Sequence, residues 1–552
     1  MSASRRTATT AVATLLFTAL PTVLTGCIGS AADQVNYAVD GVLTSYNTNT
    51  VTGAASAGPQ AFSRVLTGFS LHGPDGQVLA DGDFGSVSVV GREPLMLDYQ
   101  IADDAVYSDG KPVSCDDMVL AWAAQSGRFP GFAAASRAGY LDIAGIDCQP
   151  GQKKARVNFL PGRSIIDYRQ LFTATSMMPS HVIDDELGIS TTGAVQSGDL
   201  AAIGRVAEAW NTIWDLTPGM DPEAFTRFPS SGPYKLDAML ESGAVVLTAN
   251  DRWWGAKPVT ERITVWPRGV DVQDRINTGD FHVVDVATGS LGTLTTPDDY
   301  QSTEIDSGGI EQLIFAGGGP LADPSARRSV ALCTPRDEIA ANAEMPVANA
   351  RLNPDDDDAY SAAEAAAEGG RFGVADPDAA SALLEGEALT VRIGYQAPNP
   401  RLAAAMAAIA RSCAAAGITV VDLATEGTDP RDLRDGRIDA LLSSTGGAAG
   451  SGSTGSSAMD AYTLHTGNGN NLSGYSNPQI DGIIAALAVT TAPKEEARLL
   501  ADGAPMLWTD MPTLPLYRQQ RTVMSAKKMF GVEANPTKWG AGWNMDRWRL
   551  EP

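Results

Sequence analysis

Strand-like and helix-like segments alternate along the whole chain, and this alternation constrains the fold more than any other feature of the sequence. Apolar patterns typical of strands occupy residues 35–43, 95–101, 155–160, 245–249 and 263–266. Residues 116–124 and 481–487 predict helices that begin with a capping acid. Because 552 residues are too many for one hydrophobic core, the mixture predicts an α/β protein with two or more packed lobes or domains.

An excess of acidic residues limits the partners that the chain can bind. The formal net charge is -25, and the acids are spread along the chain. Such a protein repels phosphate backbones and anionic lipid head groups, so we expect no nucleic-acid binding and no adsorption to membranes through a basic patch. Attachment to a membrane then requires a covalent lipid.

The N-terminus carries the signal for such a lipid. Two arginines, at positions 5 and 6, precede an apolar run at residues 8–20 that is short for a membrane span and typical of an export signal. The run leads to Leu24-Thr25-Gly26-Cys27, which resembles a bacterial lipobox. We therefore expect a lipoprotein signal peptide at residues 1–26 and a lipid on Cys27, with the body on the outer face of the cytoplasmic membrane, in the cell envelope. An ordinary cleaved signal followed by a chance cysteine is the alternative.

Two segments depart from the globular pattern. Residues 353–370 combine a run of aspartates with alanine, glutamate and glycine, which predicts a solvated acidic loop or a weak helix. The aspartates do not alternate as calcium ligands do in a binding loop. Residues 443–457 are almost entirely glycine, serine, alanine and threonine, which predicts a flexible loop.

A set of short phrases stands out because of its turn and helix-start residues. Tyr107-Ser108-Asp109-Gly110 predicts a tight turn in which Gly110 supplies the permissive backbone, before a helix capped by Asp116 or Asp117. The other phrases lie at residues 231–236, 250–258, 320–339, 417–420, 474–481 and 511–517.

Taken in order, these phrases resemble the family 5 extracellular solute-binding proteins, which include dipeptide, oligopeptide and nickel receptors of ABC importers. The resemblance covers about residues 35 to 540. It implies an α/β, two-lobed fold like that of periplasmic binding proteins, with paired hinge strands and a ligand cleft between the lobes. The implied division is lobe I at residues 27–310 with an inserted subdomain at about 71–224, lobe II at residues 311–510, and a return to lobe I at residues 511–552.

The same resemblance suggests ligand-binding residues. Peptide-binding members use an aspartate late in the second lobe to pair with the ligand amine, and its nearest counterpart here is Asp460, with Tyr462 as a wall. Tyr46, Asn47 and Asn49 occupy a region where family members present polar side chains to the cleft, and they suit a sugar or a peptide backbone. A solvated loop around Asp460 and a hydrogen-bonded turn around Asn47 are the structural alternatives.

Cysteine usage fits an oxidising compartment. Apart from Cys27, the chain has four cysteines, which allow three pairings. We favour Cys115 with Cys148 and Cys333 with Cys413, since each bond would then lie within one lobe and leave the lobes free to move. Buried free thiols are the alternative. A zinc site is disfavoured, because no two cysteines stand two to four residues apart.

Two functions follow from the resemblance, and neither is enzymatic. The sequence offers no nucleophile elbow, phosphate loop or metal-ligand spacing among its four histidines, so we expect no catalysis, cofactor or metal. The first function is the receptor of an ABC peptide importer, a monomer that hands a peptide to a permease. The alternative is a role like that of the LpqW-type actinobacterial lipoproteins, which keep this fold and are linked to envelope glycolipid assembly (phosphatidylinositol mannosides and lipoarabinomannan).

Overall fold

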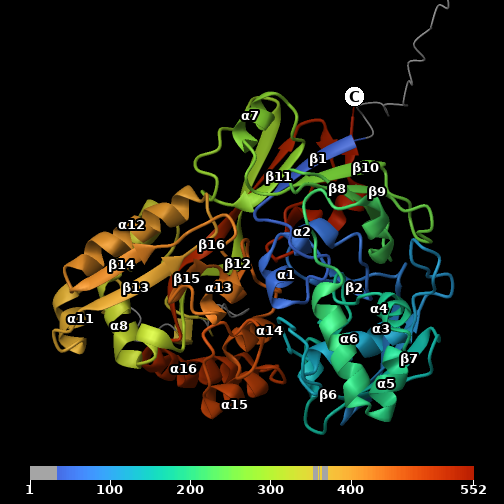
Figure 1. The fold of residues 1–552 in the computed structure, drawn as a ribbon, viewed down its shortest axis with the longest axis horizontal. Helices are drawn as coiled ribbons and strands as arrows, with labels where there is room; N and C mark the ends of the chain where they lie inside the picture. The colour runs from blue at the N-terminus through green and yellow to red at the C-terminus, as the bar shows by residue number, and fades with distance from the viewer. Residues whose placement is uncertain (1–33, 352–358, 360, 364–370, 552) are drawn as a thin grey trace, which may run out of the picture.

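A ten-stranded sheet runs through both halves of the molecule (Figure 1). The computed structural model describes residues 34–351, 359, 361–363 and 371–551. The strand order is β14-β13-β15-β12-β16-β11-β1-β10-β9-β8. The bounds are β1 Gln34–Val39, β8 Tyr234–Met239, β9 Val245–Ala249, β10 Arg262–Trp266, β11 Val283–Ala287, β12 Tyr300–Phe315, β13 Leu389–Gly394, β14 Ile418–Asp422, β15 Ala440–Ser443 and β16 Thr513–Ala526.

Strands β12 and β16 connect the two halves. They are antiparallel partners over most of their length, and β16 also pairs with β11 in the first half. The far end of β12 pairs with β15 in the second half. The ladder between β12 and β16 is irregular between Asp306 and Gln312, which is where a long two-strand connection bends most easily. These two strands therefore form the hinge between two lobes. The exact residue boundaries of the lobes stay a prediction.

The second lobe is a parallel α/β unit with helices around its strands. Strand β13 pairs in parallel with both β14 and β15, through crossovers that contain α12 and α13. Its apolar core includes Leu313, Val391 and Ile409. The helices are α8 Pro324–Cys333, α9 Arg336–Asn342, α11 Pro377–Leu383, α12 Pro400–Ala414, α13 Pro430–Arg434, α14 Ser457–Asp460, α15 Pro478–Leu487 and α16 Pro493–Asp510.

A four-stranded antiparallel sheet and helices extend the first lobe (Figure 1). Its strands, in the order β4-β5-β7-β6, pack on a core that contains Leu97, Met118 and Val157. Further short pieces complete the lobe. The bounds are β2 Ser70–His72, β3 Val78–Ala80, β4 Gly85–Arg92, β5 Leu95–Ile101, β6 Ile143–Cys148, β7 Lys154–Phe159, β17 Met529–Phe530, β18 Arg549–Leu550, α1 Val51–Ala55, α2 Gly58–Phe62, α3 Cys115–Gln125, α4 Ser180–Leu187, α5 Thr191–Ser197, α6 Leu200–Thr212 and α7 Val272–Asn277.

Most predicted elements are confirmed, several with bounds shifted by one residue, and the larger differences concern two helix caps and one strand end. The N-cap of α3 is Ser114, with Asp117 completing a capping box, and the N-cap of α15 is Asn477 instead of an acid. The predicted caps were thus wrong: the helices are capped by a serine and an asparagine that precede the predicted acids by two to four residues. The first strand ends at Val39, four residues before the predicted end, because Gly41 has φ +140° and turns the chain.

Both disulfides hold together elements of one lobe. Cys115 at the start of α3 is bonded to Cys148 at the end of β6, and Cys333 of α8 is bonded to Cys413 of α12. These are the favoured pairs. The Cys115–Cys148 bond also accounts for the one metal-like cluster of the described residues, since bonded sulfurs offer no thiolate to an ion. Cys27 and most of the acidic stretch 353–370 lie outside the described residues.

Candidate functional site

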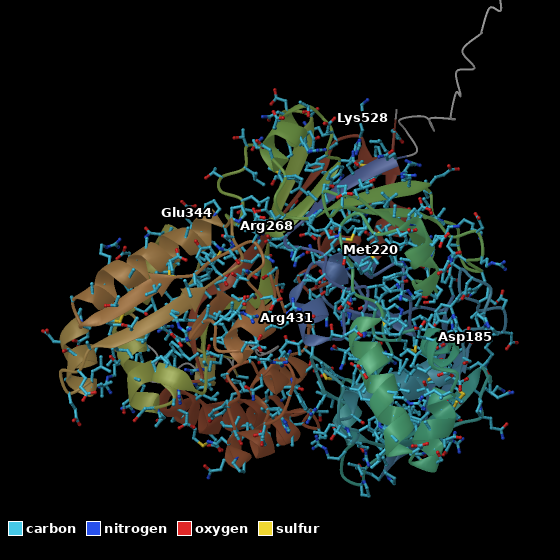
Figure 2. All side chains as sticks on the ribbon, viewed as in Figure 1. Asp185, Met220, Arg268, Glu344, Arg431 and Lys528 are labelled. Carbon is cyan, nitrogen blue, oxygen red and sulfur yellow. A yellow bond between two sulfur atoms is a disulfide. The ribbon has the colours of Figure 1, made fainter. Side chains whose placement is uncertain are left out.

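The two lobes meet along an interface that we call the seam. It begins beside the hinge, at Arg268 of the first lobe and Arg401 of the second. Arg401 of α12 forms an ion pair with Glu311 of β12 at 2.7 Å and donates to the carbonyl of Thr288 in the first lobe at 2.6 Å. Arg268 of the first lobe pairs with Asp40 and reaches across to a carbonyl in the second lobe. Figure 2 shows Arg268 at the centre of the molecule, where the two halves approach each other. These buried charges tie the lobes together next to the hinge.

The glycine- and serine-rich segment 443–457 fills the middle of the seam. The hydroxyl of Ser451, 1% exposed, donates to the carbonyls of Ser307 and Pro536. The amide of Lys538 donates to the carbonyl of Ser453 at 2.9 Å, and the amide of Ala449 bonds to first-lobe Ala55 at 3.1 Å. The prediction of a flexible loop was therefore wrong. Small side chains let this backbone approach the first lobe closely, and several of its hydrogen bonds are made with that lobe.

Asp460 lies at the end of this segment and is buried. Its carboxylate accepts hydrogen bonds from the hydroxyl of Ser453 at 2.8 Å and the amide of Thr454 at 2.9 Å. Burial raises the pKa of Asp460 to about 6; the hydrogen bonds from Thr454 and Ser453 oppose that rise, and the positive charge of Lys538, from the first lobe, opposes it less strongly. The side chain is therefore not a solvated loop residue. It is a carboxylate held near neutral pKa, with a cation from the opposite lobe nearby.

On the first-lobe side, the residues near Asp460 form an aromatic and basic cluster. The ring of His72 stacks on Trp539, with centroids 4.1 Å apart, and the ammonium of Lys538 lies 4.8 Å from the centroid of the Trp539 ring. Burial, with the charge of Lys538, lowers the pKa of His72 to about 3. Burial also lowers the pKa of Lys538, whereas the charge of Asp460 acts to raise it. His72 is thus neutral, and Asp460 is the counter-charge of Lys538.

Tyr462 occupies a second part of the seam. It is 1% exposed and stacks on His465 at 5.2 Å. Burial and the charge of Asp142 raise its pKa, and Arg163 opposes this rise. Arg163 itself binds Asp142 at 2.6 Å and donates to the carbonyl of Ala485 in α15. Tyr462 is therefore packed against first-lobe charges and is not displayed on an open wall.

Tyr46 belongs to the core of the first lobe. Its hydroxyl donates to the carbonyl of Pro229 at 3.1 Å, and its ring packs edge-on against Phe62 and Phe228. Burial raises its pKa above the ordinary range. In this arrangement the side chain supports the lobe and presents no polar atom to a ligand.

Asn47 and Asn49 form a hydrogen-bonded turn behind the seam. The Asn47 amide donates to the carbonyl of Trp210 at 3.0 Å, and its oxygen accepts from the Asn49 side chain at 3.0 Å. Asn49 also donates to Thr175 and, through its carbonyl, binds the amide of Ala135 at 2.7 Å. Ala135 contacts Asn470 of the second lobe across the seam, so this turn supports the seam from the first-lobe side. The structure does not bring Tyr46, Asn47 and Asn49 together with Asp460.

A glycine- and asparagine-rich turn that the sequence reasoning missed closes the seam against Ala135. The amide of Asn470 donates to the carbonyl of Ala135 at 2.7 Å, and Asn468 accepts from the amide of Arg137 at 2.7 Å. A Cβ on Gly469 would overlap the carbonyl of Ala134. The run of glycine and asparagine at residues 467–471 was the available signal, since such residues permit close backbone contact.

The seam is closed in this structure. A cavity of about 30 Å³ lies between the lobes, and its lining includes Thr44, Ser56, Gln396 and Ser443. Such a volume suits about one or two water molecules. A peptide would enter only after the lobes separate about the hinge. In addition, no helix of the described residues is long and apolar enough to cross a membrane.

Comparisons with known proteins agree with this architecture. The family model described as "Bacterial extracellular solute-binding proteins, family 5 Middle" matches residues 93–469. An uncharacterised lipoprotein of Mycobacterium tuberculosis (strain H37Rv) is 62% identical over 530 residues, which cover 96% of this chain and 95% of the relative. A second relative from Mycobacterium tuberculosis (strain CDC 1551), the probable monoacyl phosphatidylinositol tetramannoside-binding protein LpqW, is 25% identical over 44% of this chain and 34% of its own length.

A solved structure gives the fold. The oligopeptide-binding protein AppA of Bacillus subtilis, in complex with a nonapeptide, superposes with a TM-score of 0.72 at 14% identity and covers 94% of this chain and 99% of AppA. The expected two-lobed α/β fold is thereby confirmed. With its family match over most of the sequence, this chain belongs to the family 5 bacterial extracellular solute-binding proteins.

Proposed function

We propose that this protein is a lipid-anchored receptor on the outer face of the cytoplasmic membrane. It captures a peptide or peptide-like solute between its lobes and presents it to an ABC permease. The lipid would be carried by Cys27, which fits the lipoprotein name of the 62% identical relative. The AppA complex supports the class of ligand, since AppA holds a nonapeptide. As in the rest of the family, no catalytic step is required.

The observation that carries this proposal is the position of Asp460. A carboxylate with a pKa of about 6 is buried where the second lobe meets the first. The positive charge of Lys538, from the first lobe, acts on this carboxylate in the closed seam. An amine-bearing ligand that entered the open seam would offer the same charge to the same carboxylate. The ligand would then favour the lobe arrangement in which both sets of contacts are made.

Mass spectrometry of the small molecules released on denaturation tests this proposal directly. We expect short peptides or other primary amines, and we expect their affinity to fall at least about tenfold in Asp460→Asn, since one charged contact is lost. Asp185→Asn is the matched control, because Asp185 is an exposed acid whose side chain is 66% accessible. Equal affinity in the Asp460 variant and the wild type would contradict the assignment of Asp460.

A second function is favoured by the hydrogen bonds of segment 443–457 across the seam. This segment stands where peptide-binding members carry their recognition phrase, and here Ser451 and Ser453 bond to first-lobe main chain. A protein whose seam is closed by its own backbone would bind an envelope glycolipid without importing peptide; the relative LpqW is named as a probable monoacyl phosphatidylinositol tetramannoside-binding protein. Release of glycolipid, or of nothing, together with no thermal shift from a peptide library, would favour this role.

A further inference from the structure

A groove of about 550 Å³ opens on the first lobe, apart from the seam. Leu71 of β2 and Leu79 of β3 are cross-strand partners, and both line it. Because side chains alternate along a strand, His72 points to the other face of the same hairpin, where it stacks on Trp539. The hairpin therefore has the seam on one face and the groove on the other. The opposite wall comes from the C-terminal residues 531–547.

The groove has an apolar and aromatic wall. Trp543 lines it and is half-buried, and its indole N–H donates to the carbonyl of Glu533 at 3.2 Å, which fixes the orientation of the ring. Leu71 and Leu79 face the same space, and Leu79 is 36% exposed. A fixed indole and two leucines can cover the apolar stem of a small ligand.

The floor of the groove is a buried ionic cluster with more acid than base. The guanidinium of Arg64 lies between Asp81 at 3.1 Å and Asp546 at 2.8 Å, and all three side chains are less than 9% exposed. Asp546 also forms an ion pair with Arg547 at 3.1 Å. Burial acts to lower the pKa of Arg64, but attraction to Asp546 and Asp81 outweighs it and raises that pKa. The positive charges of the groove are thus committed to Asp546 and to one oxygen of Asp81.

Three carboxylates keep acceptor oxygens free. Asp81 uses Oδ2 on Arg64, and no described residue donates to its Oδ1, although the residue is only 7% exposed. Asp83 uses Oδ2 on the amide of Ala256, and no hydrogen bond among the described residues occupies its Oδ1 or the Glu533 carboxylate. The lining residues comprise four acids and two arginines, so the groove carries a net charge of -2. An anion is repelled there, and a cation finds unused acceptors.

We propose that this groove binds a small organic cation, an ammonium or guanidinium group carried on an apolar stem. The charged end would bond to the free oxygens of Asp83, Glu533 and Asp81, and the stem would lie on Trp543, whose ring face also attracts cations. The groove volume lies within the usual range for small-molecule sites, about 300 to 1,000 Å³. The site is distinct from the seam and does not depend on the proposed function of the protein.

Isothermal titration of the full-length mature protein in physiological salt tests the proposal with ligands of matched length. Agmatine and 1,5-diaminopentane should bind one per chain, whereas 1,5-pentanediol and glutarate should not. The Asp83→Asn and Glu533→Gln variants should each weaken binding of both compounds at least about fivefold. A ligand stem on Trp543 should quench tryptophan fluorescence in the wild type, and Trp543→Leu should abolish this quenching. An unchanged melting temperature shows that a variant is folded. If only one of the Asp83 and Glu533 variants is folded, that variant decides the test.

Two controls separate binding in the groove from binding elsewhere on the protein. Asp185→Asn removes an acid at the outer edge of the first lobe (Figure 2) and should leave diamine binding unchanged. Asp460→Asn removes the carboxylate that the proposed function assigns to amines in the seam, so the one ligand per chain that this variant still binds is the ligand of the groove. Failure of both agmatine and 1,5-diaminopentane to bind at millimolar concentration would overturn the proposal. So would an equal loss in the Asp185 variant, which indicates diffuse charge attraction, or a loss confined to the Asp460 variant, which indicates binding in the seam.

Discussion

Replacing Asp460 with asparagine should stabilise the protein at pH 8 and leave its stability at pH 4 almost unchanged. The carboxylate is buried, which raises its pKa from 3.8 to about 6. A difference of about two pKa units corresponds to about 3 kcal/mol between the two protonation states. The asparagine amide can keep the local contacts, since its oxygen accepts from Thr454 and its NH₂ donates to Ser453.

The direction of the pH effect follows from the raised pKa. Below about pH 3, Asp460 is protonated in both the folded and the unfolded chain and costs nothing, and at pH 4 the cost is still small. As the pH rises toward 6, the unfolded chain loses its proton first, so the free energy of unfolding falls. Above pH 6 the folded carboxylate is ionised too, and the full cost remains. Asparagine has no proton to lose, so the variant should gain up to about 3 kcal/mol at pH 8, a figure that already includes the attraction to Lys538 because that attraction contributes to the folded pKa of about 6.

Urea titrations of wild type, Asp460→Asn and the surface control Asp185→Asn at pH 4, 6 and 8 measure this effect. The difference between the Asp460 variant and wild type should grow from near zero at pH 4 to its full value above pH 6, and the control should show no such trend. A variant that is less stable than wild type at pH 8 would refute the reasoning. It would mean that the ionised carboxylate is stabilised in the fold, with a pKa below the ordinary range.

Three further predictions test other parts of the structure. Gly469→Ala should open the seam, because the added Cβ would overlap the carbonyl of Ala134; small-angle X-ray scattering should give a larger radius of gyration, and an unchanged radius would contradict this. Replacing Cys333 and Cys413 with serine removes a cross-link over 80 residues and should cost about 4 to 5 kcal/mol in urea titrations, a difference that must vanish when wild type is reduced. Tyr46→Phe should cost about 1 to 2 kcal/mol through the two hydrogen bonds that its hydroxyl makes with Pro229 and Ser230 and leave ligand affinity unchanged; reduced affinity at unchanged stability would make Tyr46 a ligand contact.

Local patterns predicted the elements well because each depends on nearby residues. The strands at 95–101 and 245–249 have the predicted bounds, and Gly110 has the positive φ, +91°, that its turn requires. The helix starts were displaced, because several residues near each start could serve as caps. Only the position of the preceding backbone decides that Ser114 and Asn477 take this role.

The candidate site was harder to predict because it depends on contacts between distant segments. The composition of residues 443–457 correctly indicates a backbone with little side-chain bulk, but the same composition suits a flexible loop and a tightly packed one. The opposing first-lobe surface decides between these two structures, because the carbonyls of Ser307 and Pro536 accept hydrogen bonds from the Ser451 hydroxyl. Likewise, Asp460 and Lys538 are 78 positions apart in the sequence. Only the fold brings their charges close enough to interact.

The closed seam has a consequence for any ligand of the proposed receptor. Because the Ser453 hydroxyl and the Thr454 amide already bond to the Asp460 carboxylate, and Lys538 already acts on it with a positive charge, an incoming amine must replace contacts that the chain makes with itself. If the closed arrangement is populated without ligand, the apparent affinity falls in proportion to the fraction of molecules that are open. Substitutions that weaken the self-contacts without touching the carboxylate therefore raise apparent affinity, whereas loss of Asp460 itself lowers it. Opposite effects on affinity thus distinguish a residue that binds the ligand from one that takes its place.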